Sequence, residues 1–313
     1  MSAVRIPRWL ILALTALGVL LSACNRAPEE LAGAQSEPAA AVRQLVGHLQ
    51  RDDLAGFARS AVPKEDWAVF EQAWREDRSR WPLSELPLEK QLVPMLATLS
   101  APGSEQRLRR EFDRQFARQD RDLREAARSL GLFGVEYVKN EPRYNATQRQ
   151  HYTQVLGALS AWAQQAPLSD PALARNTIQK LAAAARKTGF TRPEQLREAG
   201  MEESLRRLSP FYAEARATFT RYGLPLDTTL ADLRTGLVEQ QGDRAIVRIH
   251  YPLGDTEIDS QVSLQRRGGE WYLSDYLREA DRLRAEAFAA ATSDEKPADE
   301  KPDAATTPVA PPP

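Results

Sequence analysis

Cysteine is almost absent from this sequence, because Cys24 is the only one among 313 residues. A chain with one cysteine can form neither an internal disulfide framework nor a cysteine-based zinc site. Histidine is also scarce, with three residues, and the chain contains neither a glycine-rich phosphate loop nor a Gly-x-Ser-x-Gly elbow. We therefore expect no metal site and no cofactor.

Neither sign of charge predominates, since the chain has 42 Lys and Arg residues and 43 Asp and Glu residues. Such a chain lacks the basic surface that nucleic acids require, so we expect no nucleic-acid partner. Long apolar runs are lacking as well. The run from Trp9 to Leu21 has 13 residues, which as a helix would span about 20 Å against a hydrocarbon core of about 30 Å.

The first 23 residues have the pattern of an export signal, with Arg5 and Arg8 before the apolar run and small residues after it. Their removal takes away two arginines and no acid, so the formal charge moves from −1 to −3. The segment Leu21-Ser22-Ala23-Cys24 resembles the lipobox of bacterial lipoproteins. The resemblance implies cleavage before Cys24 and lipidation of its thiol.

Asn25 follows this cysteine, where the family's inner-membrane retention signal has Asp. The resemblance therefore implies a lipid anchor in the inner leaflet of the outer membrane, with the protein facing the periplasm. An ordinary secretory signal with a chance cysteine is the alternative interpretation.

The two ends of the mature chain have the composition of unstructured segments. Residues 24–37 predict a short flexible tether. Residues 291–313 are rich in proline and contain one branched aliphatic residue, Val309, and no aromatic residue, so we expect a disordered tail. The tail is either a spacer or ligand that reaches a partner, or an inert extension.

Residues 38–223 show helical periodicity with recurrent stop signals, as in the stripe Val42, Leu45, Val46 and Leu49. We expect one long charged helix from Ser104 to Leu130, with Leu130 directed inward and Gly131 as its C-terminal cap. The last helix of the region is expected to stop at Gly223.

Residues 224–290 change to a period of two between Leu230 and Ser274, and then return to a helical pattern. Turn signals at 242–243, 252–255 and 268–269 predict a four-stranded antiparallel meander. The turns predict that Val238 lies opposite Val247, Ile249 opposite Ile258, Leu264 opposite Leu273 and Arg266 opposite Trp271. The expected fold class is α+β, mainly α: an N-terminal multi-helix region, the meander and a closing helix.

The polar face of this sheet holds the candidate site residues. The predicted registers place His250 opposite Glu257 and Arg248 opposite Asp259, with Glu239 nearby. A His–carboxylate pair can act as a general base, and Arg248 can bind an anionic group. Alternating charges on one side of an antiparallel sheet are also typical of an ordinary solvated face.

Two segments resemble parts of the cystatin-like α+β cone domains of the scytalone dehydratase and nuclear transport factor two type. Residues 41–63 are similar to the opening helix of that family, and Gly-Gly-Glu-Trp-Tyr-Leu-Ser-Asp at 268–275 is similar to its last strand. The resemblance implies a curved sheet packed on helices around a cone-shaped cavity. About 160 helical residues would be inserted between the two segments, and the family's catalytic Asp/His pattern has no matching positions.

These features together predict an outer-membrane-anchored periplasmic lipoprotein, lipidated at Cys24, that is a non-catalytic binding or assembly factor. Its expected partners are the membrane, through the anchor, and an envelope protein or cell-wall component. Two alternatives stay open: a hydrolase- or dehydratase-like enzyme with a cavity that uses His250, and a carrier of a small molecule or lipid.

Overall fold

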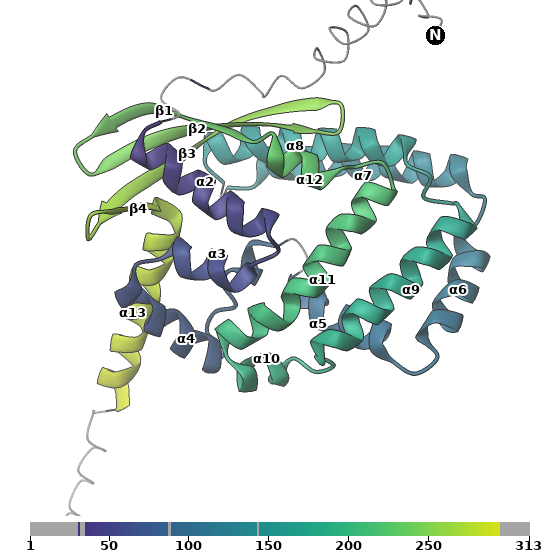
Figure 1. The fold of residues 1–313 in the computed structure, drawn as a ribbon, viewed down its shortest axis with the longest axis horizontal. Coiled ribbons are helices and arrows are strands. Elements are labelled where there is room, and N and C mark those ends of the chain that lie inside the picture. The colour runs from purple at the N-terminus through teal and green to yellow at the C-terminus, as the bar shows by residue number, and fades with distance from the viewer. Residues whose placement is uncertain (1–30, 32–34, 87–88, 143, 295–313) are drawn as a thin grey trace, which may run out of the picture.

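The computed structural model describes residues 31, 35–86, 89–142 and 144–294. The expected signal peptide, Cys24, most of the tether and the tail beyond residue 294 lie outside the described residues. Helices make up most of the described chain and are followed by a four-stranded antiparallel sheet and a closing helix (Figure 1). The prediction of an α+β fold that is mainly α is therefore confirmed.

The helices of the described chain are α2 (Glu37–Gln50), α3 (Leu54–Ala61), α4 (Trp67–Arg75), α5 (Glu89–Ser100), α6 (Ser104–Gln115), α7 (Asp120–Asn140), α8 (Ala146–Gln165), α9 (Pro171–Thr188), α10 (Glu194–Ala199), α11 (Met201–Arg221), α12 (Leu226–Ala231) and α13 (Ser274–Asp294). Two short 3-10 helices are η2 (Lys64–Asp66) and η3 (Leu83–Glu85). The strands are β1 (Arg234–Gln241), β2 (Arg244–Leu253), β3 (Thr256–Arg267) and β4 (Glu270–Leu273).

Local sequence chemistry explains several helix ends. The Asp170 carboxylate accepts hydrogen bonds from the first turn of α9, whose first residue is Pro171, and Gly189 ends that helix in a left-handed conformation with φ of 67°. Asn145 and Gln148 form a capping box at the start of α8. At the other end of the chain, α13 extends to Asp294, so the closing helix runs four residues beyond the expected boundary at 290.

The prediction of a single helix from Ser104 to Leu130 is wrong, because the chain breaks between α6 and α7. Arg118 has a φ of 61°, and its backbone N–H donates to the Ser169 carbonyl at 3.0 Å. This contact is made with the corner between α8 and α9, so the break depends on tertiary structure. Gly131 does not cap a helix but lies within α7, where it packs closely against α8.

The sheet has the order β1-β2-β3-β4, as a meander requires, but it starts after α12, at Arg234. The pairs Leu264–Leu273 and Arg266–Trp271 are confirmed. The pair of Ile249 and Ile258 is wrong, because Ile258 lies opposite Tyr251. The turn between β2 and β3 holds only residues 254–255, which displaces the register by two residues.

The prediction that Val238 pairs with Val247 is wrong, because β1 contains a bulge. Leu237 takes that place, and Val238 is half exposed. The errors leave the division of β2 and β3 into two faces intact, because side chains alternate with a period of two and a shift of two residues keeps each on its face.

The apolar face of the sheet is covered by α2, the first helix of the described chain (Figure 1). Ala39 and Val42 of this helix pack on four buried side chains of the sheet: Ala245, Val247, Leu264 and Trp271. The far end of the same face packs on α8 through Leu253 and Ile258.

The helical core includes residues from both predicted regions. Ala280 and Leu283 of α13 are fully buried and pack with Phe70, Trp74 and Leu205 of the helices. Because α2 covers the sheet and α13 completes the helical core, regions 38–223 and 224–290 are joined through shared cores.

Candidate functional site

His250 lies on β2, on the sheet face opposite α2, and its side chain is 19% exposed. Its Nε2 atom is 2.8 Å from Glu257 Oε2, and its Nδ1 atom is 3.5 Å from Asp259 Oδ2. Arg248 Nε donates to both oxygens of Asp259, at 3.0 and 2.9 Å. The structure thus brings all four candidate residues together, although the predicted backbone pairs are wrong: His250 lies opposite Asp259 rather than Glu257, and Arg248 lies opposite Gln261 rather than Asp259.

The electrostatics of this cluster are those of an ion-pair network. The pKa of Asp259 is held below its usual value, mainly by the hydrogen bond from Arg248 and further by His250. Glu257 is 61% exposed and Arg248 is 48% exposed. A carboxylate faces each ring nitrogen of His250, and only a doubly protonated ring can donate to both of them. A general base needs a free ring nitrogen directed at a substrate, so this arrangement favours cross-strand stabilisation over proton abstraction.

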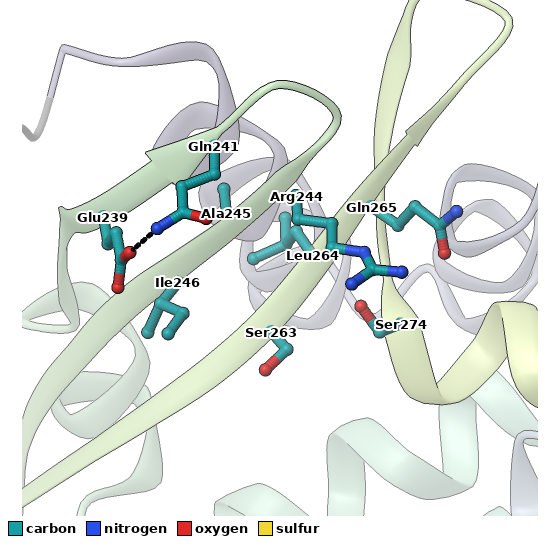
Figure 2. A pocket seen from close by; sticks show the side chains of 9 residues that line it. All are labelled: Glu239, Gln241, Arg244, Ala245, Ile246, Ser263, Leu264, Gln265 and Ser274. Carbon is teal, nitrogen blue, oxygen red and sulfur yellow. Dashed lines mark hydrogen bonds between the residues drawn. The ribbon is translucent and has the colours of Figure 1, made fainter.

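A hollow of about 270 Å³ lies on the same face of the sheet, towards the turn between β1 and β2 (Figure 2). Its lining includes Ile246, Arg244 and Ser263, and Glu239 accepts a hydrogen bond from Gln241 at its edge. Glu239 is therefore placed with this hollow and not with His250. Since His250 does not line the hollow, its cluster and this concavity do not form one site.

A larger hollow of about 520 Å³ is lined by residues 77–80, which follow α4, and by residues of η3, α5, α10 and α13. Leu83, Val93 and Leu196 contribute apolar walls, and Arg80 and Arg282 contribute charge. Arg80 is paired with Asp77, and Arg282 is paired with two glutamates of its own helix, Glu279 and Glu286. The mixed, internally paired charges differ from the apolar cavity that a lipid carrier requires.

The other two histidines have structural surroundings. His48 Nδ1 is 2.8 Å from Asp53 Oδ2, and its Nε2 atom is 2.9 Å from the Ser60 hydroxyl. His151 packs beside Tyr152 and Tyr251, and burial lowers its pKa. Neither histidine is directed into a hollow described above.

An apolar surface on α7 is the feature that sequence reasoning missed. Leu130, Phe133 and Tyr137 are 70%, 71% and 49% exposed. They recur at positions i, i+3 and i+7 and so lie on one side of the helix. We call these three residues the α7 stripe. The expectation that Leu130 is directed inward is therefore wrong.

The α7 stripe is exposed because α7 packs mainly on one neighbouring helix, α8. A Cβ atom on Gly131 would lie 2.1 Å from the Ser160 hydroxyl, and one on Gly134 would lie 3.4 Å from Leu156, so this is the side of α7 that meets α8. The apolar residues between 123 and 138 occupy a wider arc than one neighbouring helix covers. That width is visible in the sequence, but which part stays uncovered depends on the packing.

Comparisons with protein-family models, curated proteins and solved structures find no match to this chain. Across residues 35–294, apart from the undescribed gaps, no group of three or more His, Cys, Asp or Glu side chains is placed to hold a metal ion. None of the helices described is both long and apolar enough to cross a membrane.

Proposed function

We propose that this protein is a lipid-anchored lipoprotein of the outer membrane that faces the periplasm and binds another envelope component without catalysing a reaction. The observation that carries the binding role is the α7 stripe. Isolated exposed apolar side chains are common on proteins, but a contiguous group is typical of an interaction surface. The lipobox-like segment ending at Cys24 supports the anchor.

The His250 cluster gives weaker support to an enzyme. Both ring nitrogens already face carboxylates, and the cluster is separate from the hollow on its sheet face. The charged lining of the larger hollow likewise gives weaker support to a carrier of apolar ligands. A binding surface on α7 needs neither a proton-transfer group nor a closed cavity.

The anchor is tested by growing cells with an alkyne-tagged fatty acid and following the protein in membrane fractions. The wild-type chain is expected to carry the tag and to sediment with the outer membrane. Cys24→Ala is expected to lose the tag. A wild-type chain without label would overturn the anchor.

The binding role is tested by placing a photo-cross-linking amino acid at single positions of the full-length protein in living cells. Position 133 is expected to give a discrete cross-linked product. Position 132 is the matched control, because Leu132 is also apolar and 65% exposed but lies about 100° away around the same helix. Equal cross-linking at both positions, or turnover of a small substrate that is lost in His250→Gln, would contradict the proposal.

A further inference from the structure

We infer that the α7 stripe docks an amphipathic helix of a partner protein, and that basic residues flank the apolar face of that helix. The inference rests on the proposed function and specifies the chemistry of its partner. It is drawn from what lies on either side of the stripe.

The stripe occupies an arc of about 60° around α7 at about 100° per residue. One flank of the arc is covered by α8, as the close approach at Gly131 and Gly134 shows. The other flank holds the exposed carboxylates of Asp122 and Glu136, together with Glu125, whose Oε1 atom is paired with Arg121 Nε at 3.1 Å.

Two other basic residues of α7 are placed differently. Arg128 and Lys139 project about 150–170° from the middle of the stripe and are exposed. An occupant of the stripe therefore meets apolar side chains in the centre and carboxylates along its open edge. An apolar helix face with Lys or Arg beside it is complementary to this surface.

The same charge pattern disfavours other occupants. Two copies of this chain joined through the stripe would bring acidic flanks together. An anionic lipid surface would meet the same carboxylates. The sequence of this chain from Asp294 to Asp303 has five acidic residues and two lysines, so it carries the same sign of charge as the open edge.

The size of the stripe is consistent with a single docked helix. Aromatic side chains bury about 150–250 Å² each, so three partly exposed side chains offer a few hundred Å². A stable protein dimer needs about 800 Å² per partner. Burial of these apolar side chains supplies the attraction that anchors the partner, and the flanking charges raise or lower the affinity.

The experiment measures the affinity of the mature polypeptide, residues 25–313, for two synthetic helical peptides by fluorescence anisotropy. The peptides share one apolar stripe, and they differ in having Lys or Glu at the flanking positions. The Lys peptide is expected to bind at least about tenfold more tightly than the Glu peptide, a difference of about 1.4 kcal/mol. Phe133→Ser is expected to weaken the Lys peptide by about tenfold or more, whereas Leu132→Ser should leave its affinity unchanged.

Charge reversal gives the second arm. The double variant Asp122→Lys, Glu136→Lys is expected to shift the preference towards the Glu peptide, and circular dichroism of each variant checks that the helices persist. Equal affinity for both peptides, or equal effects of Phe133→Ser and Leu132→Ser, would overturn the inference. So would a dimer in light scattering that Phe133→Ser dissociates, or equally tight binding to phosphatidylglycerol vesicles through Phe133.

The outcomes separate this inference from the proposed function. If position 133 cross-links in cells but the Lys and Glu peptides bind with equal affinity, the binding role is supported and a basic helix is rejected as the partner. If the Lys peptide binds more tightly than the Glu peptide but position 133 gives no cross-link in cells, the surface has the inferred chemistry and is not used for binding in the envelope.

Discussion

Glu105, at the start of α6, has a carboxyl pKa well below its usual value. Arg186 Nη2 donates to its Oε1 atom at 2.6 Å. This hydrogen bond, together with the residue's own backbone N–H and the Ser104 hydroxyl, lowers the pKa of Glu105 to about 2. The pair joins α6 to the end of α9, so its protonation state affects helix packing.

Replacing Glu105 by Gln should lower the free energy of unfolding at pH 7 by about 0.5–1 kcal/mol, as for a partly exposed ion pair. Because the folded-state pKa lies below that of the unfolded chain, this stabilisation is complete above about pH 4.5 and disappears as the pH falls towards 2. Urea unfolding of both proteins between pH 2 and 7 measures the difference. Glu198→Gln, at an exposed carboxylate on α10, is the control, and a difference that persists at pH 2 would contradict the explanation.

At the residue scale, the candidate cluster could be predicted, although its exact pairs could not. His250, Glu257, Arg248 and Asp259 share a face because alternation along the strands requires it. The turn between β2 and β3 holds two residues instead of four, and this changes each backbone partner. The diagonal reach of Arg and Glu side chains restores the predicted contacts despite the shifted register.

At the scale of elements, the seam between α7 and α8 depends on small residues. A Cβ atom on Gly131 would overlap the Ser160 hydroxyl and its Cβ atom, at 2.1 and 2.4 Å. Gly157 of α8 has open space around it instead. The two glycines lie on two helices that pack together, one at a crowded position and one at an open position. The same substitution can therefore be compared at both.

Gly131→Ala should destabilise the protein by about 1–3 kcal/mol, because the added methyl group forces the two helices apart. Gly157→Ala should stabilise it by about 0.5–1 kcal/mol through the higher helix propensity of alanine. Chemical denaturation of the two variants measures both signs. Similar effects of the two substitutions would show that the close approach at Gly131 is not a constraint on the packing.

Elements that depend on nearby residues could be predicted from the sequence, as Asp170-Pro171 at the start of α9 and the turn at Gly268-Gly269 show. Elements that depend on distant contacts could not be predicted. The helix break at Arg118 is fixed by the Ser169 carbonyl, 51 positions further along the chain. The uncovered stripe on α7 has the same kind of cause, since only the packed structure shows which side α8 leaves open.

At the scale of the whole molecule, a buried ion-pair cluster joins the sheet to the helices, in addition to the apolar cores that they share. Asp66, at the entry to α4, is fully buried and is paired with Arg284 of α13 and with Arg267 at the end of β3. Loss of either element would remove one of the two arginines that compensate this buried carboxylate, which is costly. The sheet and the helical core are thus tied by apolar packing and by charge.

We therefore expect the sheet and the helical core to unfold in a single transition. Native-state hydrogen exchange should give the backbone amides of Val247, in the sheet core, and Leu205, in the helical core, the same free energy of opening. Asp66→Ala should lower both values together, by about 2 kcal/mol or more. A sheet that opens at lower free energy than the helices would show two independent units.

The cover that α2 provides for the sheet also determines the order in which the chain can fold. Trp271 Nε1 donates to Glu37 Oε2 at 3.4 Å across 234 positions of sequence. During synthesis from the N-terminus, Ala39 and Val42 are among the first core residues to emerge, and their partners on β3 and β4 are among the last. Contacts of such long separation make folding slow. Helix α2 must therefore wait, with the side that carries Ala39 and Val42 unburied, until nearly the entire chain is present.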